Sequence, residues 1–291
     1  MPGEPTKTQT QPEPESTTAS LLYFTPPADG SRPYTRVIHS DNDTHPPQNW
    51  SSEPHTVQIK NLRGRQDLAS LDTTGFQFYK HKSASTYETF DNEEEIKEKY
   101  YPETIELIKQ LTGASLVVLF DHTIRRHRAG LKDTIHSRQP VARVHVDQTP
   151  KSAHVRVHKH VSDPALAESL AKGRFQILNL WRPLGHPAFA WPLALCDYRT
   201  VKTDRDLAAV TRIAMDGTEG ETFAVKHSEE HQWMYLRGMT PEEVVLIKCY
   251  DSLEDENISV YTPHTAFEDP STPEGSPPRE SIELRALVFY N

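Results

Sequence analysis

A mainly β fold with a few helices outside it is predicted by three features of this sequence. The second half of the chain is a succession of short apolar runs rich in β-branched and aromatic residues. Turns that contain Pro, Gly and Asp separate these runs. Only two stretches show helical spacing. Many strands with few helices predict a double-stranded β-helix, a jelly-roll or cupin-like architecture, with helices packed around it.

The helices and the first buried strand are expected before the main run of strands. Residues 91–111 carry apolar side chains at helical intervals, and Pro102 is expected to divide them into two helical pieces. Residues 115–120 have the length and branching of a buried strand, and residues 163–172 are expected to form a second helix. The remaining strands are expected at 175–184, 193–201, 221–226, 232–236, 244–250, 260–267 and 281–290.

Composition divides the chain into three parts. Residues 1–19 are rich in Pro, Thr, Glu and Gln and lack aromatic residues, which predicts a disordered leader. Residues 20–73 carry many Pro, Ser, Asn and Asp and are expected to form an irregular N-terminal arm on the surface. Residues 74–291 are expected to form the β-helix domain. The oligomeric state has no clear signal, and a homodimer that exchanges residues 20–70 is a hypothesis.

Charge and length exclude several classes of function. The 291 residues carry a formal net charge of −9, which argues against a general nucleic-acid binder because such affinity rests on neutralising phosphates. No run approaches the ~18 apolar residues that span a bilayer, and no secretory signal is visible. Cys196 and Cys249 lie in apolar, strand-like runs and are expected to be buried free thiols. We therefore expect a cytoplasmic protein that acts on a small molecule.

A histidine and an aspartate with metal-ligand spacing lie in the alternating run 141–147. His145 and Asp147 are two residues apart, so a strand directs both side chains to one face. His264, far downstream, would complete a set of two histidines and one carboxylate. This set marks non-heme Fe(II) oxygenases, because it leaves about three octahedral positions for substrate and oxygen chemistry.

Other histidines offer a competing interpretation. His154, His158 and His160 share one parity if their segment is a strand. Arg156 interrupts this row, and a flat row of side chains does not converge well on one ion. A basic patch near an anionic substrate, or a solvated face, is the favoured interpretation of this segment.

The last predicted strand supplies candidate anchors for a keto acid. Residues 279, 281, 283 and 285 share one face of that strand. An Fe(II) oxygenase that uses a keto acid needs a cation for the distal carboxylate, and arginine offers a charged bidentate fork. We favour Arg279 with the hydroxyl of Ser281, and we keep Arg285 as the alternative.

Further residues are candidates for contact with the substrate. Residues 268–278 form a Pro-rich segment close to the site and are interpreted as a mobile lid. Trp181 is more often a core residue than a substrate contact, and Lys248 is a charge within an apolar run. The substrate-contact candidates are Asn179, Trp181, Arg182 and Lys248.

Several of these segments together resemble a known family. The sequence is similar to the mainly fungal hydroxylase/desaturases related to the cephalosporin 7α-methoxylation protein and to GA4-desaturase-like proteins. The resemblance extends from about residue 74 to 291, with the motifs in order. The matching segments are 74–76, 120–126, 144–147, 179–183, 192–199, 239–243, 246–252, 263–267 and 278–282.

The resemblance implies an Fe(II)/2-oxoglutarate-dependent dioxygenase that uses O2 on a double-stranded β-helix. Its metal triad would map to His145, Asp147 and His264, and its 2-oxoglutarate carboxylate to Arg279 or Arg285. The reaction would be hydroxylation, desaturation or oxidative cyclisation of a small molecule in secondary metabolism. Two alternatives are an Fe(II) oxidase that does not use 2-oxoglutarate, and a non-catalytic ligand-binding jelly roll.

Overall fold

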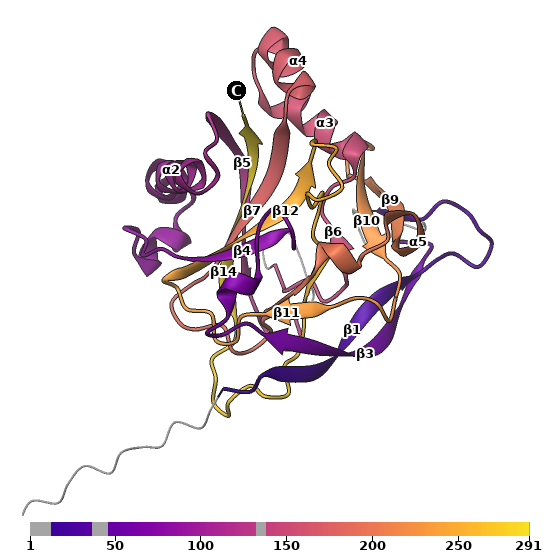
Figure 1. Ribbon diagram of the computed structural model, residues 1–291, viewed down its shortest axis with the longest axis vertical. Helices are drawn as coiled ribbons and strands as arrows, with labels where there is room; N and C mark the ends of the chain where they lie inside the picture. Colours follow the sequence, from indigo (N-terminus) through magenta and orange to yellow (C-terminus); the bar gives the residue numbers. More distant parts are fainter. Residues whose placement is uncertain (1–12, 37–45, 132–137, 291) are drawn as a thin grey trace, which may run out of the picture.

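Two β-sheets form the body of the protein in the computed structural model, which describes residues 13–36, 46–131 and 138–290 (Figure 1). Among these residues the large sheet holds, in order, β1 (Ser16–Thr25), β3 (Ser51–Asn61), β11 (Trp233–Tyr235), β8 (Leu193–Cys196), β13 (His264–Ala266), β6 (His145–Val146), β10 (Glu219–Val225), β9 (Leu207–Ile213) and β2 (Tyr34–Arg36). The small sheet holds β4 (Phe76–Lys80), β12 (Glu243–Asp251), β7 (Phe175–Pro183), β14 (Glu280–Phe289) and β5 (Leu116–Arg126). The predicted jelly-roll fold is confirmed.

The small sheet is antiparallel and buried on both faces at its centre. Every residue of β7 and β12 is buried, which explains why both strands are mostly apolar. On one face Leu180 packs with the helical layer, while its neighbour Trp181 faces the space between the sheets. Leu195 of the large sheet contacts the same inner cluster as Trp181. The site therefore lies where the inner faces of the two sheets meet.

Helices cover the small sheet on its outer face and at one end (Figure 1). Leu107 and Ile108 of α2 are buried against the outer face, and Pro102 lies in the first turn of α2, where a missing N–H is tolerated. Gly113 ends α2 with a φ of 73°. The described helices are α1 (Glu93–Glu95), α2 (Tyr101–Thr112), α3 (Pro150–His160), α4 (Pro164–Lys172) and α5 (Thr203–Asp206).

The N-terminal region differs from the expected irregular arm. β1 pairs with β3 along its whole length, from Ser16 opposite Lys60 to Thr25 opposite Ser51, and β3 joins β11. The prediction of an irregular arm was therefore wrong for these segments. The expected leader lies partly outside the described residues, which begin at residue 13, and its end belongs to β1. The boundary at residue 74 stays a prediction.

The histidine-rich segment that was expected to be a strand is the helix α3. Thr149 and Ser152 exchange hydrogen bonds in a capping box, and Pro150 occupies the first helical turn. Ala153 and Val157 are the buried residues of α3, four positions apart. Val155 and Val157 alternate with polar residues, and this spacing is also typical of a strand. The β9 strand was missed, and the strands expected at 193–201 and 260–267 are shorter than predicted.

Candidate metal and keto-acid site

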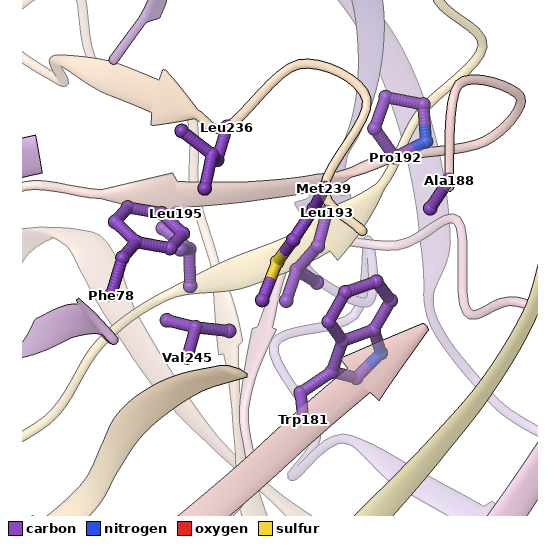
Figure 2. Close-up of a pocket in the computed structure, with 9 residues that line it drawn as sticks. All are labelled: Phe78, Trp181, Ala188, Pro192, Leu193, Leu195, Leu236, Met239 and Val245. Atoms are coloured by element: carbon purple, nitrogen blue, oxygen red, sulfur yellow. The ribbon is translucent and has the colours of Figure 1, made fainter. Parts of the chain in front are cut away.

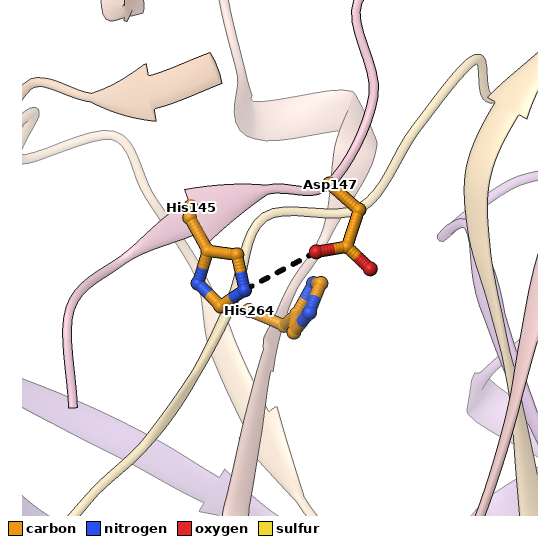
Figure 3. A group of neighbouring side chains, drawn as sticks. All are labelled: His145, Asp147 and His264. Atoms are coloured by element: carbon orange, nitrogen blue, oxygen red, sulfur yellow. Dashed lines mark ion pairs between the residues drawn. The ribbon is translucent and has the colours of Figure 1, made fainter. Parts of the chain in front are cut away.

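Three side chains converge where β6 and β13 meet in the large sheet (Figure 3). His145 and His264 are directly opposite each other across this antiparallel pair, and Asp147 follows the end of β6. Their candidate ligand atoms all lie within 4.8 Å of one another. The structure thus brings together the three residues that the sequence nominated, although His264 is more than a hundred positions from the other two along the chain.

Backbone carbonyls fix the orientation of both imidazole rings. The Nδ1–H of His145 donates to the carbonyl of Arg143 at 2.8 Å, and the Nδ1–H of His264 donates to the carbonyl of Thr262 at 3.0 Å. A carbonyl only accepts, so the proton of each neutral ring is on Nδ1 and Nε2 keeps a free lone pair. This is the arrangement that orients a metal-binding histidine.

The carboxylate of Asp147 is held from its other side. Its Oδ2 accepts a hydrogen bond from Nδ2 of Asn179 at 2.7 Å and a longer one from the thiol of Cys249 at 3.7 Å. Its Oδ1 lies 3.4 Å from Nε2 of His145. One oxygen is therefore positioned by β7 and β12, and the other faces the histidines.

Electrostatics favours the metal-binding protonation states. Burial, reinforced by the charge of His145, lowers the pKa of His264 to about 4, so its imidazole is neutral at ordinary pH. Burial acts to raise the pKa of Asp147. A hydrogen bond from His145 and the charge of His264, both present only when these rings are doubly protonated, hold it well below its usual range. A neutral ring and an ionised carboxylate are the forms that bind a divalent metal.

A buried arginine faces the same cavity as the triad. Arg279 directly precedes β14 and is 2% exposed, and its Nη1–H donates to the carbonyl of Trp191 at 2.8 Å. Its guanidinium lies 5.6 Å from the ring centroid of Trp181. Its Nε is buried and has no hydrogen-bond partner among the described residues. Burial lowers the pKa of Arg279 to about 9, and Arg125 adds to this effect. An unpartnered buried cation of this kind calls for an anion.

The backbone that holds Arg279 is itself unusual. Trp191 has a φ of 51° and is the one non-glycine residue with positive φ in the described part of the chain. This conformation costs a bulky residue roughly 1–2 kcal/mol. Strain of this kind is concentrated at functional sites. Here it aims the Trp191 carbonyl at Arg279 and so fixes the direction of the guanidinium.

The rival arginine has a partner of its own. Arg285 forms a bidentate ion pair with Asp121 of β5, with Nε 2.7 Å from Oδ1. Ser281 is buried on β14, two residues from Arg279. Asp121 already compensates the charge of Arg285. Arg285 is therefore the weaker candidate for a keto-acid anchor.

The four substrate-contact candidates separate into two pairs. Asn179 contacts Asp147, and Trp181 lines both the triad cavity and a neighbouring apolar cavity with Leu193 and Met239 (Figure 2). The other pair lies in buried networks outside these cavities. Arg182 donates to the hydroxyl of Tyr100 and to backbone carbonyls, and Lys248 bonds to Asp251 at 2.9 Å. These two are structural charges, so we do not retain them as substrate contacts.

Four residues at the site were not nominated from the sequence. Arg125 and Glu283 line the triad cavity, Trp191 holds Arg279, and Cys249 contacts Asp147. Burial and the nearby charge of Asp147 raise the pKa of Glu283. Alternation had placed Glu283 on the same strand face as Arg279, but no role was assigned to it. Nothing local in the sequence marks Trp191 or Cys249.

A jelly roll with two histidines and a carboxylate at one point, beside a buried arginine, defines the class of non-heme iron, keto-acid-dependent oxygenases. A family model described as "Oxidoreductase/YMDC permease-like domain" matches residues 21–289. In the described part of the chain, no helix is long and apolar enough to cross a membrane.

Individual proteins agree with this class. The chain is 32% identical to "Alpha-ketoglutarate-dependent dioxygenase tstK" of Talaromyces stipitatus over 93% of this chain and 96% of that protein. It is 36% identical to "Hydroxylase/desaturase efuI" of Hormonema carpetanum over 93% and 94% of the two chains. The solved structure of the iron and alpha-ketoglutarate-dependent endoperoxidase NvfI superposes with a TM-score of 0.83 at 31% identity, over 95% of this chain and 99% of that one.

The chain therefore belongs to the fungal family of Fe(II)/2-oxoglutarate-dependent dioxygenases and hydroxylase/desaturases. It is an oxidoreductase that uses iron, 2-oxoglutarate and O2 to oxidise a small molecule, as the sequence motifs predicted. The alternative of a non-catalytic jelly roll and that of an oxidase without 2-oxoglutarate are both set aside by these relatives.

Proposed function

We propose that His145, Asp147 and His264 hold the iron of this dioxygenase. The convergence of their ligand atoms carries this proposal, and the carbonyl-anchored Nδ1 atoms of both rings support it. Two imidazole nitrogens and one carboxylate oxygen leave about three positions of an octahedral ion open. The residues present thus fit an iron that must also bind a keto acid and O2.

Arg279 is proposed as the anchor of the distal carboxylate of 2-oxoglutarate, with Ser281 beside it. The unpartnered Nε and the burial of this guanidinium support the assignment. Arg285 is less favoured because Asp121 already occupies its fork. When bound, iron with 2-oxoglutarate supplies the O2 activation by which a substrate C–H bond is oxidised.

The remaining residues position these groups and limit the access of water. Asn179 holds the carboxylate of Asp147 so that Oδ1 stays directed at the metal position. Trp181 presents its ring to Arg279, and such a cation–π contact partly replaces the lost hydration of the guanidinium. The cavity beside Trp181 is lined by apolar side chains (Figure 2). The site therefore oxidises only molecules that reach the open coordination positions of the metal.

Anaerobic titration with Fe(II) and 2-oxoglutarate tests these roles. Wild-type protein should develop the visible metal-to-ligand charge-transfer band of an iron-bound keto acid. Asp147→Ala should abolish the band, and Arg279→Gln should shift its midpoint to higher 2-oxoglutarate concentration. Arg285→Gln is the matched comparison. A larger midpoint shift in Arg285→Gln than in Arg279→Gln would reverse the assignment of the two arginines.

The reaction, location and assembly of the enzyme complete the proposal. Hydroxylation, desaturation and oxidative cyclisation all fit the same site, and a relative is named a hydroxylase/desaturase. Product analysis with succinate quantified per turnover identifies the outcome.

A cytoplasmic location is supported by Cys196 and Cys249, which are free and buried. A homodimer is proposed through β1, an edge strand of the large sheet, and light scattering tests it.

A further inference from the structure

A second, larger cavity adjoins the triad on the side of α3. Its volume is about 580 Å³, within the range of about 300–1,000 Å³ that holds drug-sized ligands. Residues of α3, β9 and β10 form its walls, and Asp147 and Arg285 line it as well. Because Asp147 belongs both to this cavity and to the triad cavity, a molecule that fills it lies next to the proposed metal position.

Four guanidinium groups line this cavity, and two of them have no anionic partner among the described residues. Arg32 pairs with Glu221. Arg285 is neutralised by Asp121. Arg156 has a ring contact with Phe120 and lies 3.5 Å from Nε2 of His160, but neither it nor Arg212 forms an ion pair with a carboxylate in the described parts of the chain. Two uncompensated cations therefore lie on one cavity wall.

The charges of these groups oppose one another. Desolvation by the surrounding wall lowers the pKa of Arg156, and the charge of Arg285 lowers it further. Arg212 is exposed on the open side of this cavity, and its charge also acts to lower the pKa of Arg156. An anion placed between Arg156 and Arg212 would relieve this repulsion, and guanidinium forks match a carboxylate in geometry.

The acidic residues of the cavity do not fill this role. Asp147 attracts both guanidinium groups, but Asn179 holds its carboxylate at the proposed metal position. Glu221 pairs with Arg32 and accepts a hydrogen bond from Thr149. Asp216 accepts hydrogen bonds from its own turn, at Thr218. Glu219 is exposed. These carboxylates belong to β10 and its preceding turn, whereas the cationic wall is built by α3 and β9.

Apolar side chains complete the wall between the cations. Val155 of α3 is 57% exposed although it is apolar, and it lines the cavity together with Ile213 of β9. An exposed valine inside a cavity offers its surface to an apolar ligand. The wall as a whole suits a molecule with a hydrocarbon skeleton and one acidic group.

We propose that this cavity binds the organic substrate of the enzyme as a carboxylate, held by Arg156 and Arg212, with its hydrocarbon skeleton against Val155 and Ile213 and toward Asp147. The inference rests on the proposed function in one respect, namely that the metal position lies at Asp147. It names the class of substrate: an organic acid larger than 2-oxoglutarate.

A binding experiment with two matched probes tests the inference without turnover. Protein is loaded anaerobically with Fe(II) and saturating 2-oxoglutarate, so that the keto-acid position is filled. It is then titrated with dansyl-labelled undecanoic acid and, separately, with the primary amide of the same molecule, with fluorescence as the readout. The acid should bind at least about tenfold more tightly than the amide. Equal affinities would overturn the proposal.

Variants then locate the preference. Arg156→Gln combined with Arg212→Gln should reduce the affinity for the acid to that for the amide, while the double Lys variant should keep most of the preference. Val155→Trp should weaken both probes by filling the cavity. Arg279→Gln should leave the preference intact. An unchanged preference in the double Gln variant would overturn the assignment.

The charge-transfer band, recorded in the same samples, separates the two proposals. A missing band with a retained acid preference contradicts the iron and keto-acid roles and leaves the cavity assignment supported. A normal band with no acid preference contradicts the cavity assignment alone. Lys172→Gln, at an exposed lysine on α4 outside the cavity, controls for a general loss of positive charge.

Discussion

Replacement of Asn179 by alanine is expected to weaken metal binding without unfolding the protein. The lost contact is the 2.7 Å hydrogen bond from Nδ2 of Asn179 to the ionised Oδ2 of Asp147. A hydrogen bond to a charged group contributes about 1.5–3 kcal/mol. Since about 1.4 kcal/mol is a factor of ten, the dissociation constant should rise roughly 10- to 100-fold. Loss of such an outer contact of a metal ligand has effects of the same order.

The assay is an anaerobic titration of the apoprotein with Co(II), whose visible absorption reports its coordination. Gln176→Ala is the matched control, because Gln176 is buried on the same strand and donates to the carboxylate of Asp251 at 2.6 Å, away from the triad. Both variants should lose stability in urea, but only Asn179→Ala should lose metal affinity. Metal binding as tight as in wild type, or equal losses in the two variants, would refute the reasoning.

Three further outcomes are expected. Arg279→Gln should raise the Kd for 2-oxoglutarate at least about tenfold, since a charged hydrogen bond is lost, with Co(II) affinity unchanged; a change in Co(II) affinity alone would contradict this. Gly75→Ala should lower Tm by several degrees, because an added Cβ would lie 2.3 Å from Oγ1 of Thr262 at a φ of 91°. Gly64→Ala, with φ 79° and open space, should lower it less, and equal shifts would argue against the clash. Burial lowers the pKa of His231, so its contribution to stability is present above the unfolded pKa of about 6.5 and is lost as pH falls further. Urea unfolding at several pH values should therefore be less pH-dependent in His231→Gln than in wild type.

Sequence reasoning succeeded where one local pattern determines the outcome. The mostly apolar composition of β7 and β12 predicts strands, and the structure has both, buried on both faces. The spacing of His145 and Asp147 places both at one point because Asp147 directly follows a strand. In these cases the period of the pattern and the geometry of the backbone agree.

It failed where tertiary contacts choose between local alternatives. Val155 and Val157 alternate as in a strand, yet the cap at Thr149 starts a helix. The first half of β1 buries the small or polar residues Thr17 and Ala19, so the apolar signal of that half is weak. Arg285 is neutralised by Asp121 only because β14 and β5 pair in that register, which no local signal encodes.

The two proposed histidine ligands depend on a single cross-strand pair, because β6 has two residues and β13 has three. A slip of one residue in this pairing would turn one ring to the opposite face of the sheet. A metal bound by both rings therefore stabilises the native register of this strand pair and not a shifted register. The stabilisation grows with the ratio of the metal concentration to its Kd.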